Sequence, residues 1–244
     1  MRYELMLPHQ IRNAIAANTP VVLPLGVLEY HGEHLGLGLD TLVVIKLLEQ
    51  LETEQDLILL PPFYYGAASY AVAGPEGGSV QVDGDRLYPF AKDLFTSLLR
   101  TGFRNIHFVV HHQTENFTAG MPTDLAFKFG ARQAIFAFLE NTRGEGWWGK
   151  PEMADYYAQH ATGDDPFNWI TGHPLMTPEI IADYPFDHAG LGETSLLLAL
   201  CPEAVDITRL KDGPWFTKSA RDASAELGDK AKSLILAHLR KALR

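Results

Sequence analysis

The sequence predicts an α/β protein built around a mainly parallel central sheet with helices on both faces. Short apolar runs typical of buried strands alternate along the chain with longer stretches in which apolar residues recur every three or four positions. Parallel strands need a crossover between them, usually a helix, so both faces of such a sheet are covered. A length of 244 residues and a hydrophobic content of 46% suit one domain over residues 1–244.

The candidate strands are apolar runs that end in polar or glycine-rich residues. They lie at residues 20–26, 56–66 and 105–112, and residues 132–140 are a candidate fourth. In open α/β sheets, ligands bind beyond the carboxyl ends of the strands. We therefore expect a functional site where the segments that follow the first and third runs come together.

The candidate helices are residues 39–54 and 85–102, and Gly102 is typical of a helix stop. Residues 219–244 carry alternating charges and indicate a long surface helix. Residues 141–173 have no clear period and are rich in tryptophan. Within them, Trp147 and Trp148 are expected either to form a lid over the site or to be buried between subunits. Both expectations hold if this segment of one subunit covers the site of a neighbouring subunit.

Composition excludes several classes of partner and site. The formal net charge of −10 argues against a nucleic-acid or anionic-membrane partner, because both need a basic face. A single cysteine, Cys201, excludes an internal disulfide and a cysteine-based zinc cluster. Residues 1–8 lack the order of a signal peptide, and no apolar run approaches the ~20 residues of a membrane span. We expect a cytoplasmic protein.

The first candidate site is the segment LEYHGEHLGLGLD, residues 28–40, directly after the first strand. Glu29 and His31 are two residues apart, so on an extended segment they project to the same side, and the glycines let Asp40 return to them. Two carboxylates and an imidazole suit zinc, manganese or another divalent first-row ion. The alternative is a solvated polar loop that happens to carry acidic residues.

Two further segments carry ligand-type side chains. The segment HHQTEN follows the third strand and contains His111, His112 and Glu115, although a lone histidine there would suit a hydrogen-bonded core position. The segment DHAGLGETS contains His188 and Glu193. Glu193 also fits the first turn of a helix, where a carboxylate favours the helix dipole, but that alternative leaves His188 unexplained.

These three segments together resemble the creatininase family, and they occur in that family's order. The resemblance implies a three-layer α/β/α sandwich, a site for two divalent metal ions, and hydrolysis of amide-type bonds that are often cyclic. By position, Asp40 would bridge the two ions, Glu29 would bind one and His31 the other. Glu115 matches a metal-binding glutamate, and His188 and Glu193 match residues that line the reacting centre.

One position departs from the family pattern. A gapless match through Glu115 places Gln113 where the family has a histidine ligand, whereas a shift of one residue would give that role to His112. Because strand alternation puts His112 and Gln113 on opposite sides, only one of them can face the metal. The register favours Gln113 as the ligand, with His111 or His112 contacting substrate oxygens, whereas donor chemistry favours His112 as the ligand.

The expected function is a metal-dependent hydrolase of a small cyclic substrate. A hydroxide held by two ions, zinc or manganese or both, would attack a cyclic amide or a related carbonyl, and His188 would transfer a proton to the leaving group. One alternative is a hydrolase that opens a cyclic polyol ketone of the inosose type by carbon–carbon cleavage, or that cleaves a formamide. Another is a non-catalytic relative that binds metal. The resemblance also implies a homo-oligomer, a hexamer built from dimers.

Overall fold

A four-stranded, entirely parallel sheet forms the centre of the computed structural model, which describes residues 1–244. The strands are β1 (Val21–Leu25), β2 (Ile58–Leu59), β3 (Ile106–Val110) and β4 (Ile170–Pro174), in the spatial order β2-β1-β3-β4. β1 pairs with β3 along its whole length, and β3 pairs with β4 in the same way. The predicted α/β class with a parallel sheet is confirmed.

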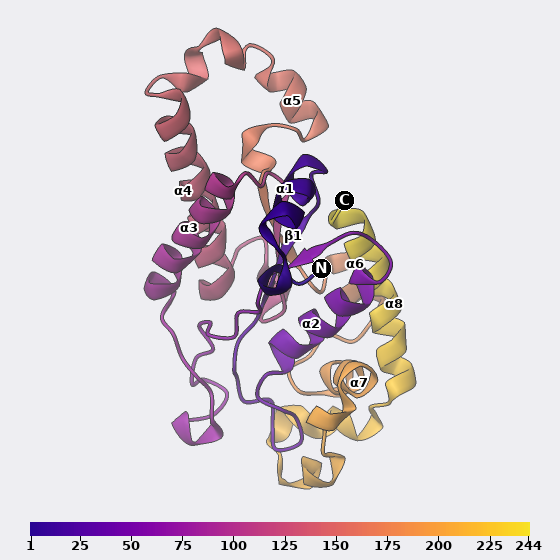
Figure 1. Ribbon diagram of the computed structural model, residues 1–244. Coiled ribbons are helices and arrows are strands. Elements are labelled where there is room, and N and C mark those ends of the chain that lie inside the picture. The colour runs from indigo at the N-terminus through magenta and orange to yellow at the C-terminus, as the bar shows by residue number, and fades with distance from the viewer.

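Helices cover both faces of this sheet (Figure 1). The helices on one face enclose an apolar core that contains Phe95, Phe108 and Phe127, and those on the other face enclose a core built largely from leucine. The first group is α1 (Pro8–Ala16), α3 (Gly84–Thr101) and α4 (Pro122–Arg143). The second is α2 (Leu39–Glu52), α6 (Pro178–Asp183), α7 (Leu191–Leu200) and α8 (Ala225–Ala242). α2 and α3 match the predicted helices, and Gly102 ends α3 with a positive φ of 122°.

The prediction of a strand at residues 132–140 is wrong, because these residues lie inside α4. A short apolar run has no period that separates a buried strand from one side of a helix. Here the buried residues Phe127, Ala131, Ala134 and Ile135 follow helical spacing and pack in the core between α4 and the sheet. The fourth strand is instead β4, an edge strand whose glycine and proline hide it from a propensity-based prediction.

Two other predicted elements are shorter than expected. Residues 56–66 form only the two-residue β2, because Pro61 and Pro62 lack the N–H groups that would continue the ladder. The C-terminal helix α8 begins at Ala225, where the Ser224 side chain accepts a hydrogen bond from the Leu227 N–H. It is not purely a surface helix, since Ile235 and neighbouring apolar residues are buried in the second core.

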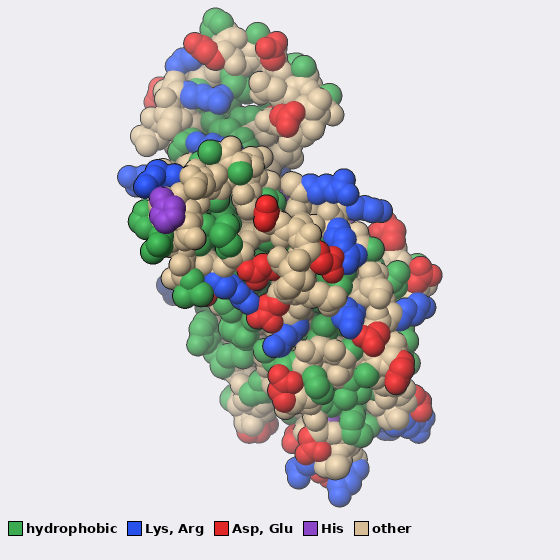
Figure 2. Space-filling view, turned by 45° about the vertical axis from the view of Figure 1, so that its right-hand side comes forward, with side chains coloured by type: hydrophobic (Ala, Val, Ile, Leu, Met, Phe, Trp, Pro, Cys, Tyr) green, Lys and Arg blue, Asp and Glu red, His purple; other side chains and the backbone are tan.

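Residues 144–169 arch away from the sheet at the end opposite α7, around the short helix α5 (Tyr156–Thr162) (Figure 1). This part of the molecule is hollowed and shows hydrophobic side chains in its interior (Figure 2). Trp147, Trp148 and Tyr156 line the hollow together with Phe136 of α4. The segment predicted as a lid or an interface therefore lies at the amino-terminal edge of the sheet.

No helix of the structure combines the length and the apolar character needed to cross a membrane.

A chain of neutral imidazoles crosses β3 and β4. The Asn105 side-chain oxygen lies 2.7 Å from His107 Nε2 and can only accept, so His107 Nε2 donates to it. His107 Nδ1 is then the acceptor for His173 Nε2, 2.9 Å away. Burial, with the neighbouring imidazole as a smaller cause, lowers the pKa of His107 to about 3. Burial, with His238 as the smaller cause, lowers the pKa of His173 to about 4. The native state therefore favours both rings without the extra proton.

We predict that this pair destabilises the protein in acid. In the unfolded chain both imidazoles take up a proton near pH 6.5, whereas the folded state takes them up only near pH 3–4. The free energy of unfolding should fall as the pH drops below 6.5, by up to ~1.4 kcal/mol per pH unit for each ring. In urea titrations between pH 7 and 4.5, a His107→Gln variant should have a shallower pH dependence than the wild type. An equally steep acid limb in the variant would contradict this assignment.

Candidate functional site

Acidic and imidazole side chains converge at the carboxyl-terminal edge of the sheet. Glu29 and His31 come from the loop after β1, and His112 comes from the loop after β3. Asp40 lies in the first turn of α2, and Glu193 lies in the first turn of α7. All five side chains are buried. Segments far apart in the sequence therefore bring three carboxylates and two imidazoles into one place.

Gly26 allows α2 to approach the end of β1 closely enough to position Asp40. A Cβ atom at residue 26 would lie 2.6 Å from the Thr41 backbone nitrogen and 2.8 Å from the Asp40 carbonyl carbon. No side chain fits there without moving the helix. The glycine at the strand end thus sets the distance between the β1 loop and the first turn of α2.

His31 is held with one nitrogen free. Its Nδ1 lies 3.0 Å from the Glu29 carbonyl oxygen, which can only accept, so Nδ1 carries the proton. In the neutral ring, Nε2 therefore carries an unprotonated lone pair. This nitrogen lies 3.4 Å from Asp40 Oδ1 and 3.6 Å from Glu193 Oε2. His31 Nε2 is buried without a hydrogen-bond partner. The ring is oriented as a metal-binding histidine is, with its second nitrogen fixed by the backbone.

His112 is held in the same way on the other side of Asp40. Its Nε2 donates to the Ala67 carbonyl oxygen at 3.2 Å, which leaves Nδ1 as the lone pair. Nδ1 lies 3.3 Å from Glu29 Oε2 and 3.4 Å from Asp40 Oδ2. The two oxygens of Asp40 thus face different histidines, Oδ1 toward His31 and Oδ2 toward His112.

These distances fit the coordination shells of two cations. Ligand atoms held ~2.1 Å from a tetrahedral ion lie roughly 3.4 Å from each other, which is close to the separations found here. Glu29, Asp40 and His112 form one such group, and His31, Asp40 and Glu193 form the other. The Oδ2 atom of Asp40 and the Nε2 atom of His31 are both buried without a hydrogen-bond partner. The residues present therefore fit two divalent ions that share Asp40.

The electrostatics of the site favour bound positive charge. Burial lowers the pKa of His31, but Asp40 and Glu193 outweigh burial and raise it to about 10. Burial likewise opposes the charged form of His112, while the nearby carboxylates of Asp40 and Glu29 raise its pKa to about 10. Burial acts to raise the pKa of Asp40 and of Glu193, and the nearby imidazoles lower both overall. The three carboxylates therefore attract protons or metal cations.

Glu193 is fixed by two donors and by the turn that precedes it. Glu193 Oε1 accepts from His111 Nε2 at 3.1 Å, and Oε2 accepts from the Ala189 N–H at 2.7 Å. The Asp187 carboxylate accepts from the N–H groups of Gly190, Gly192 and Glu193 and so caps α7. The helix-terminal environment expected for Glu193 is present, but Asp187 is the capping residue, and the Glu193 carboxylate also faces the site.

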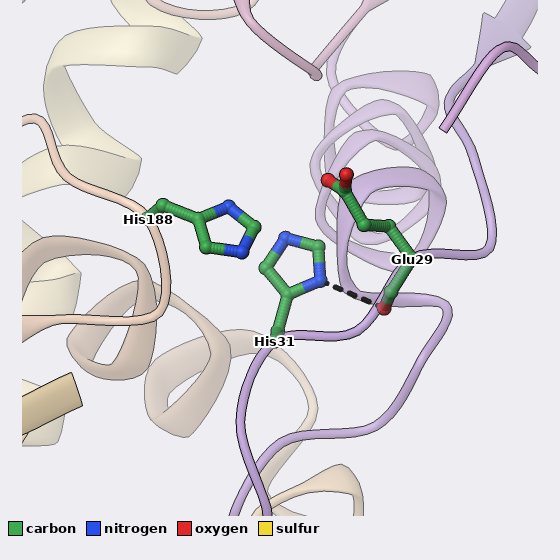
Figure 3. A group of neighbouring side chains, drawn as sticks. All are labelled: Glu29, His31 and His188. Atoms are coloured by element: carbon green, nitrogen blue, oxygen red, sulfur yellow. Dashed lines mark hydrogen bonds between the residues drawn. The ribbon is translucent and has the colours of Figure 1, made fainter. Parts of the chain in front are cut away.

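His188 lies beside His31, with ring centroids 4.4 Å apart (Figure 3). Its Nε2 donates to the Tyr30 carbonyl oxygen at 3.0 Å, so Nδ1 is the nitrogen that can exchange a proton. His188 is partly exposed and lines the cavity above the buried acids. It can form a third cluster with Glu29 and His31. The geometry gives it access both to the buried residues and to a molecule in the cavity.

Gln113 and Glu115 line the same cavity but belong to neither of the two groups of ligand atoms that share Asp40. β3 ends at Val110, and Gln113 has a left-handed backbone with φ of 53°, so the alternation assumed for an extended strand does not hold there. Glu115 is exposed, and only His112 of the segment HHQTEN reaches Glu29 and Asp40. The geometry thus supports the one-residue shift.

The cavity over the site has a volume of about 490 Å³ and includes aromatic side chains that the motifs did not indicate. Phe186, Trp215 and Phe216 supply this lining. The position of Phe186 near the site could be predicted, because it directly precedes the segment DHAGLGETS. Trp215 and Phe216 begin the short helical segment Trp215–Asp222, which contains no motif, and only the folded chain shows that Phe216 packs beside His188.

Comparison with known proteins gives a consistent result. The model of the creatininase family, described as creatinine amidohydrolase, matches residues 4–234. The chain is 25% identical over 204 residues to creatinine amidohydrolase of Pseudomonas putida, which covers 82% of this chain and 71% of that protein. It is also 25% identical over 201 residues to 3-dehydro-scyllo-inosose hydrolase of Thermotoga maritima. That match covers 82% of this chain but only 56% of the relative's length.

Solved structures share the fold. A structure described as creatininase Mn superposes with a TM-score of 0.67 at 20% identity, covering 99% of this chain and 98% of that one. A zinc–zinc form of a creatininase variant gives a TM-score of 0.66 at 20% identity, with the same coverage. A crystal structure of creatinine amidohydrolase gives a TM-score of 0.66 at 22% identity, and the match covers 99% of this chain and 95% of that one.

Proposed function

The chain belongs to the creatininase family, and we propose that it is a metal-dependent hydrolase of a small cyclic amide. The observation that carries this proposal is the position of Asp40, whose two oxygens face two separate groups of buried ligand atoms. A structural polar cluster would pair these atoms by hydrogen bonds. Here His31 Nε2 and Asp40 Oδ2 have no such partner.

The residues divide into two sets of ligands around Asp40. Glu29 and His112 would hold one ion with it, and His31 and Glu193 would hold the other. The mixture of nitrogen and oxygen donors suits zinc or manganese. Two such ions supply an activated water at neutral pH and polarise the carbonyl group under attack.

His188 would move the proton that hydrolysis requires. Its Nε2–H is engaged by the Tyr30 carbonyl oxygen, so Nδ1 accepts a proton and later gives it to the leaving nitrogen. Asp187 keeps this histidine in place by capping the turn that leads into α7. An imidazole suits both directions of transfer because one ring nitrogen can accept a proton and release it again.

A second candidate keeps the site and changes the bond. The hydrolase of 3-dehydro-scyllo-inosose matches at the same 25% identity as the creatinine amidohydrolase. Attack of water on a ring ketone followed by carbon–carbon cleavage uses the same two functions, carbonyl polarisation and proton transfer. A panel containing creatinine, a cyclic polyol ketone and an N-formyl amide separates these possibilities. No turnover of any of them by metal-loaded protein would contradict the proposed activity.

We predict that Asp40→Ala removes both metal ions and abolishes turnover, because each group of ligands would lose one member and the link between them. Metal per protein should be measured by plasma mass spectrometry after dialysis, alongside circular dichroism to verify folding. Glu33→Gln is the matched control, since Glu33 is an acid of the same loop that accepts a hydrogen bond from the Tyr30 hydroxyl and belongs to neither group of ligand atoms. Full metal content in the folded Asp40 variant would refute the assignment.

We also predict that His112 and Gln113 respond differently to substitution. His112→Ala should lower the affinity for the ion shared by Glu29 and Asp40 by at least an order of magnitude, because a ligand nitrogen is lost. Gln113→Ala should keep the metal. Competition with a chromogenic chelator measures both. Metal lost from the Gln113 variant and kept in the His112 variant would show that Gln113 is the ligand.

We propose further that the chain assembles into a homo-oligomer. Leu125, Phe129 and Phe136 are exposed and share one side of α4, while Trp148 and Tyr157 are exposed nearby in residues 144–169. Burial of these side chains between copies would remove apolar surface from water. In sedimentation velocity runs Phe129→Glu should shift the protein toward monomer, and Leu5→Glu, at another exposed apolar site, should not. A wild-type chain that is monomeric at micromolar concentration would rule this out.

A further inference from the structure

We propose that the indole of Trp215 is the surface on which the ring of the substrate stacks, and that it makes the site selective for ring compounds over open-chain ones. This inference rests on the proposed hydrolase function and defines its substrate class more closely. It concerns a tryptophan outside the segments that resemble the family signature.

The position of Trp215 is unusual for a tryptophan. It is 78% exposed, yet it lines the cavity whose other lining residues include Glu29, Asp40 and His112. An exposed indole keeps a large apolar surface in water, which is unfavourable unless something covers it. A molecule bound in the cavity would cover it, because the cavity and the indole are contiguous.

The backbone under Trp215 is fixed to the site. Trp215 begins the short helical segment Trp215–Asp222, in which the Thr217 hydroxyl donates to the Pro214 carbonyl oxygen at 2.8 Å. Thr217 is buried against Gly32, next to His31, where a Cβ atom at residue 32 would lie 2.7 Å from Thr217 Cγ2. The Leu191 N–H donates to Ser219 Oγ at 3.1 Å and ties the segment to α7. The segment that carries the indole is therefore tied both to the loop of His31 and to α7.

The neighbouring side chains lead from Trp215 to the proton-transfer residue. The Trp215 and Phe216 rings meet edge to face, with centroids 5.8 Å apart and planes at 84°. Phe216 in turn meets His188 at 5.2 Å and 63°. The rest of the apolar lining is Phe186 and the small residues Ala71 and Val72. A ring stacked on the indole would lie in the same cavity as His188 and the buried acids.

Stacking distinguishes ring compounds from open-chain ones. A ring presents a rigid flat face, or in a polyol a face of C–H groups, that covers the indole without loss of internal freedom. An open-chain amide covers less of it and must be ordered first. The metal ions that the buried carboxylates and histidines would hold would engage the reacting carbonyl in either case. Trp215 thus determines which substrates bind, and the buried cluster determines which reaction they undergo.

The test compares two ureas that hydrolyse slowly and share one functional group. 2-Imidazolidinone is a flat five-membered ring, and N,N′-dimethylurea is its open-chain counterpart. Binding to the purified full-length protein, with its metal content measured, is followed by calorimetry for the wild type, Trp215→Ala and Trp215→Phe. Trp148→Ala is the matched control, because Trp148 is a half-exposed tryptophan of the distant segment 144–169.

The wild type should bind the cyclic urea more tightly than the open-chain one. Trp215→Ala should lower the affinity for the cyclic urea by roughly 3- to 10-fold and the affinity for the open-chain urea by much less. Trp215→Phe should restore most of the preference for the cyclic urea. Melting temperature and metal content should be unchanged in all three variants, and sedimentation should be unchanged in the two Trp215 variants. Trp148→Ala should bind both ureas as the wild type does.

Three results would overturn the proposal. The first is that the wild type shows no saturable binding of the cyclic urea. The second is that Trp215→Ala loses affinity equally for both ureas. The third is that this variant dissociates from an oligomer without a change in its preference for the cyclic urea. The proposed function fails separately, when the wild type holds no metal or turns over no substrate. A protein that holds metal and turns over substrate, yet keeps its ring preference without the Trp215 indole, refutes this inference alone.

Discussion

Three buried carboxylates at the carboxyl-terminal edge of the sheet are the constraint around which this site is built. Glu29, Asp40 and Glu193 repel one another, and burial deprives each of the water that would stabilise its charge. The imidazoles of His31, His112 and His111 and the backbone N–H of Ala189 offset this cost. A chain that keeps such a cluster needs positive charge beside it, so the loops and helix ends around the cluster are arranged to hold that charge.

The sheet makes this arrangement possible because it separates two apolar cores. Asp40 and Glu193 come from helices of one layer, whereas His112 is anchored to the Ala67 carbonyl oxygen, and Ala67 belongs to the core of the other layer. The parallel strands deliver the β1 and β3 loops to the same edge. Asp40 lies where the two layers meet, which explains why each of its oxygens faces a different set of neighbours.

Much of the fold could be predicted from the sequence, because apolar runs and helical spacing are local signals. The strands around residues 20–26 and 105–112 and the helices α2 and α3 follow from them directly. The edge strand β4 could not be predicted, since it is only partly buried and contains Gly172 and Pro174. Residues 132–140 were misassigned because a helix buried along one side gives the same short apolar run as a strand.

The candidate site was predictable to the extent that its residues stand in compact segments. Glu29, His31, Asp40, His188 and Glu193 come together in the structure. The choice between His112 and Gln113 depends on backbone dihedral angles beyond the strand end, which no side-chain pattern records. Trp215 is brought to the cavity by the helical segment Trp215–Asp222, whose packing on Gly32 is a tertiary contact between residues far apart in the sequence.

The left-handed turn at Gln113 also has an evolutionary consequence. Because the backbone changes direction there, residues 112 and 113 point to different places although they are adjacent. A single insertion or deletion in such a turn can bring a different residue to the ligand position while leaving the sheet, the other ligands and the core intact. The residue that faces the candidate site can therefore shift along the sequence between relatives, and aligned positions then differ from the positions that are equivalent in space.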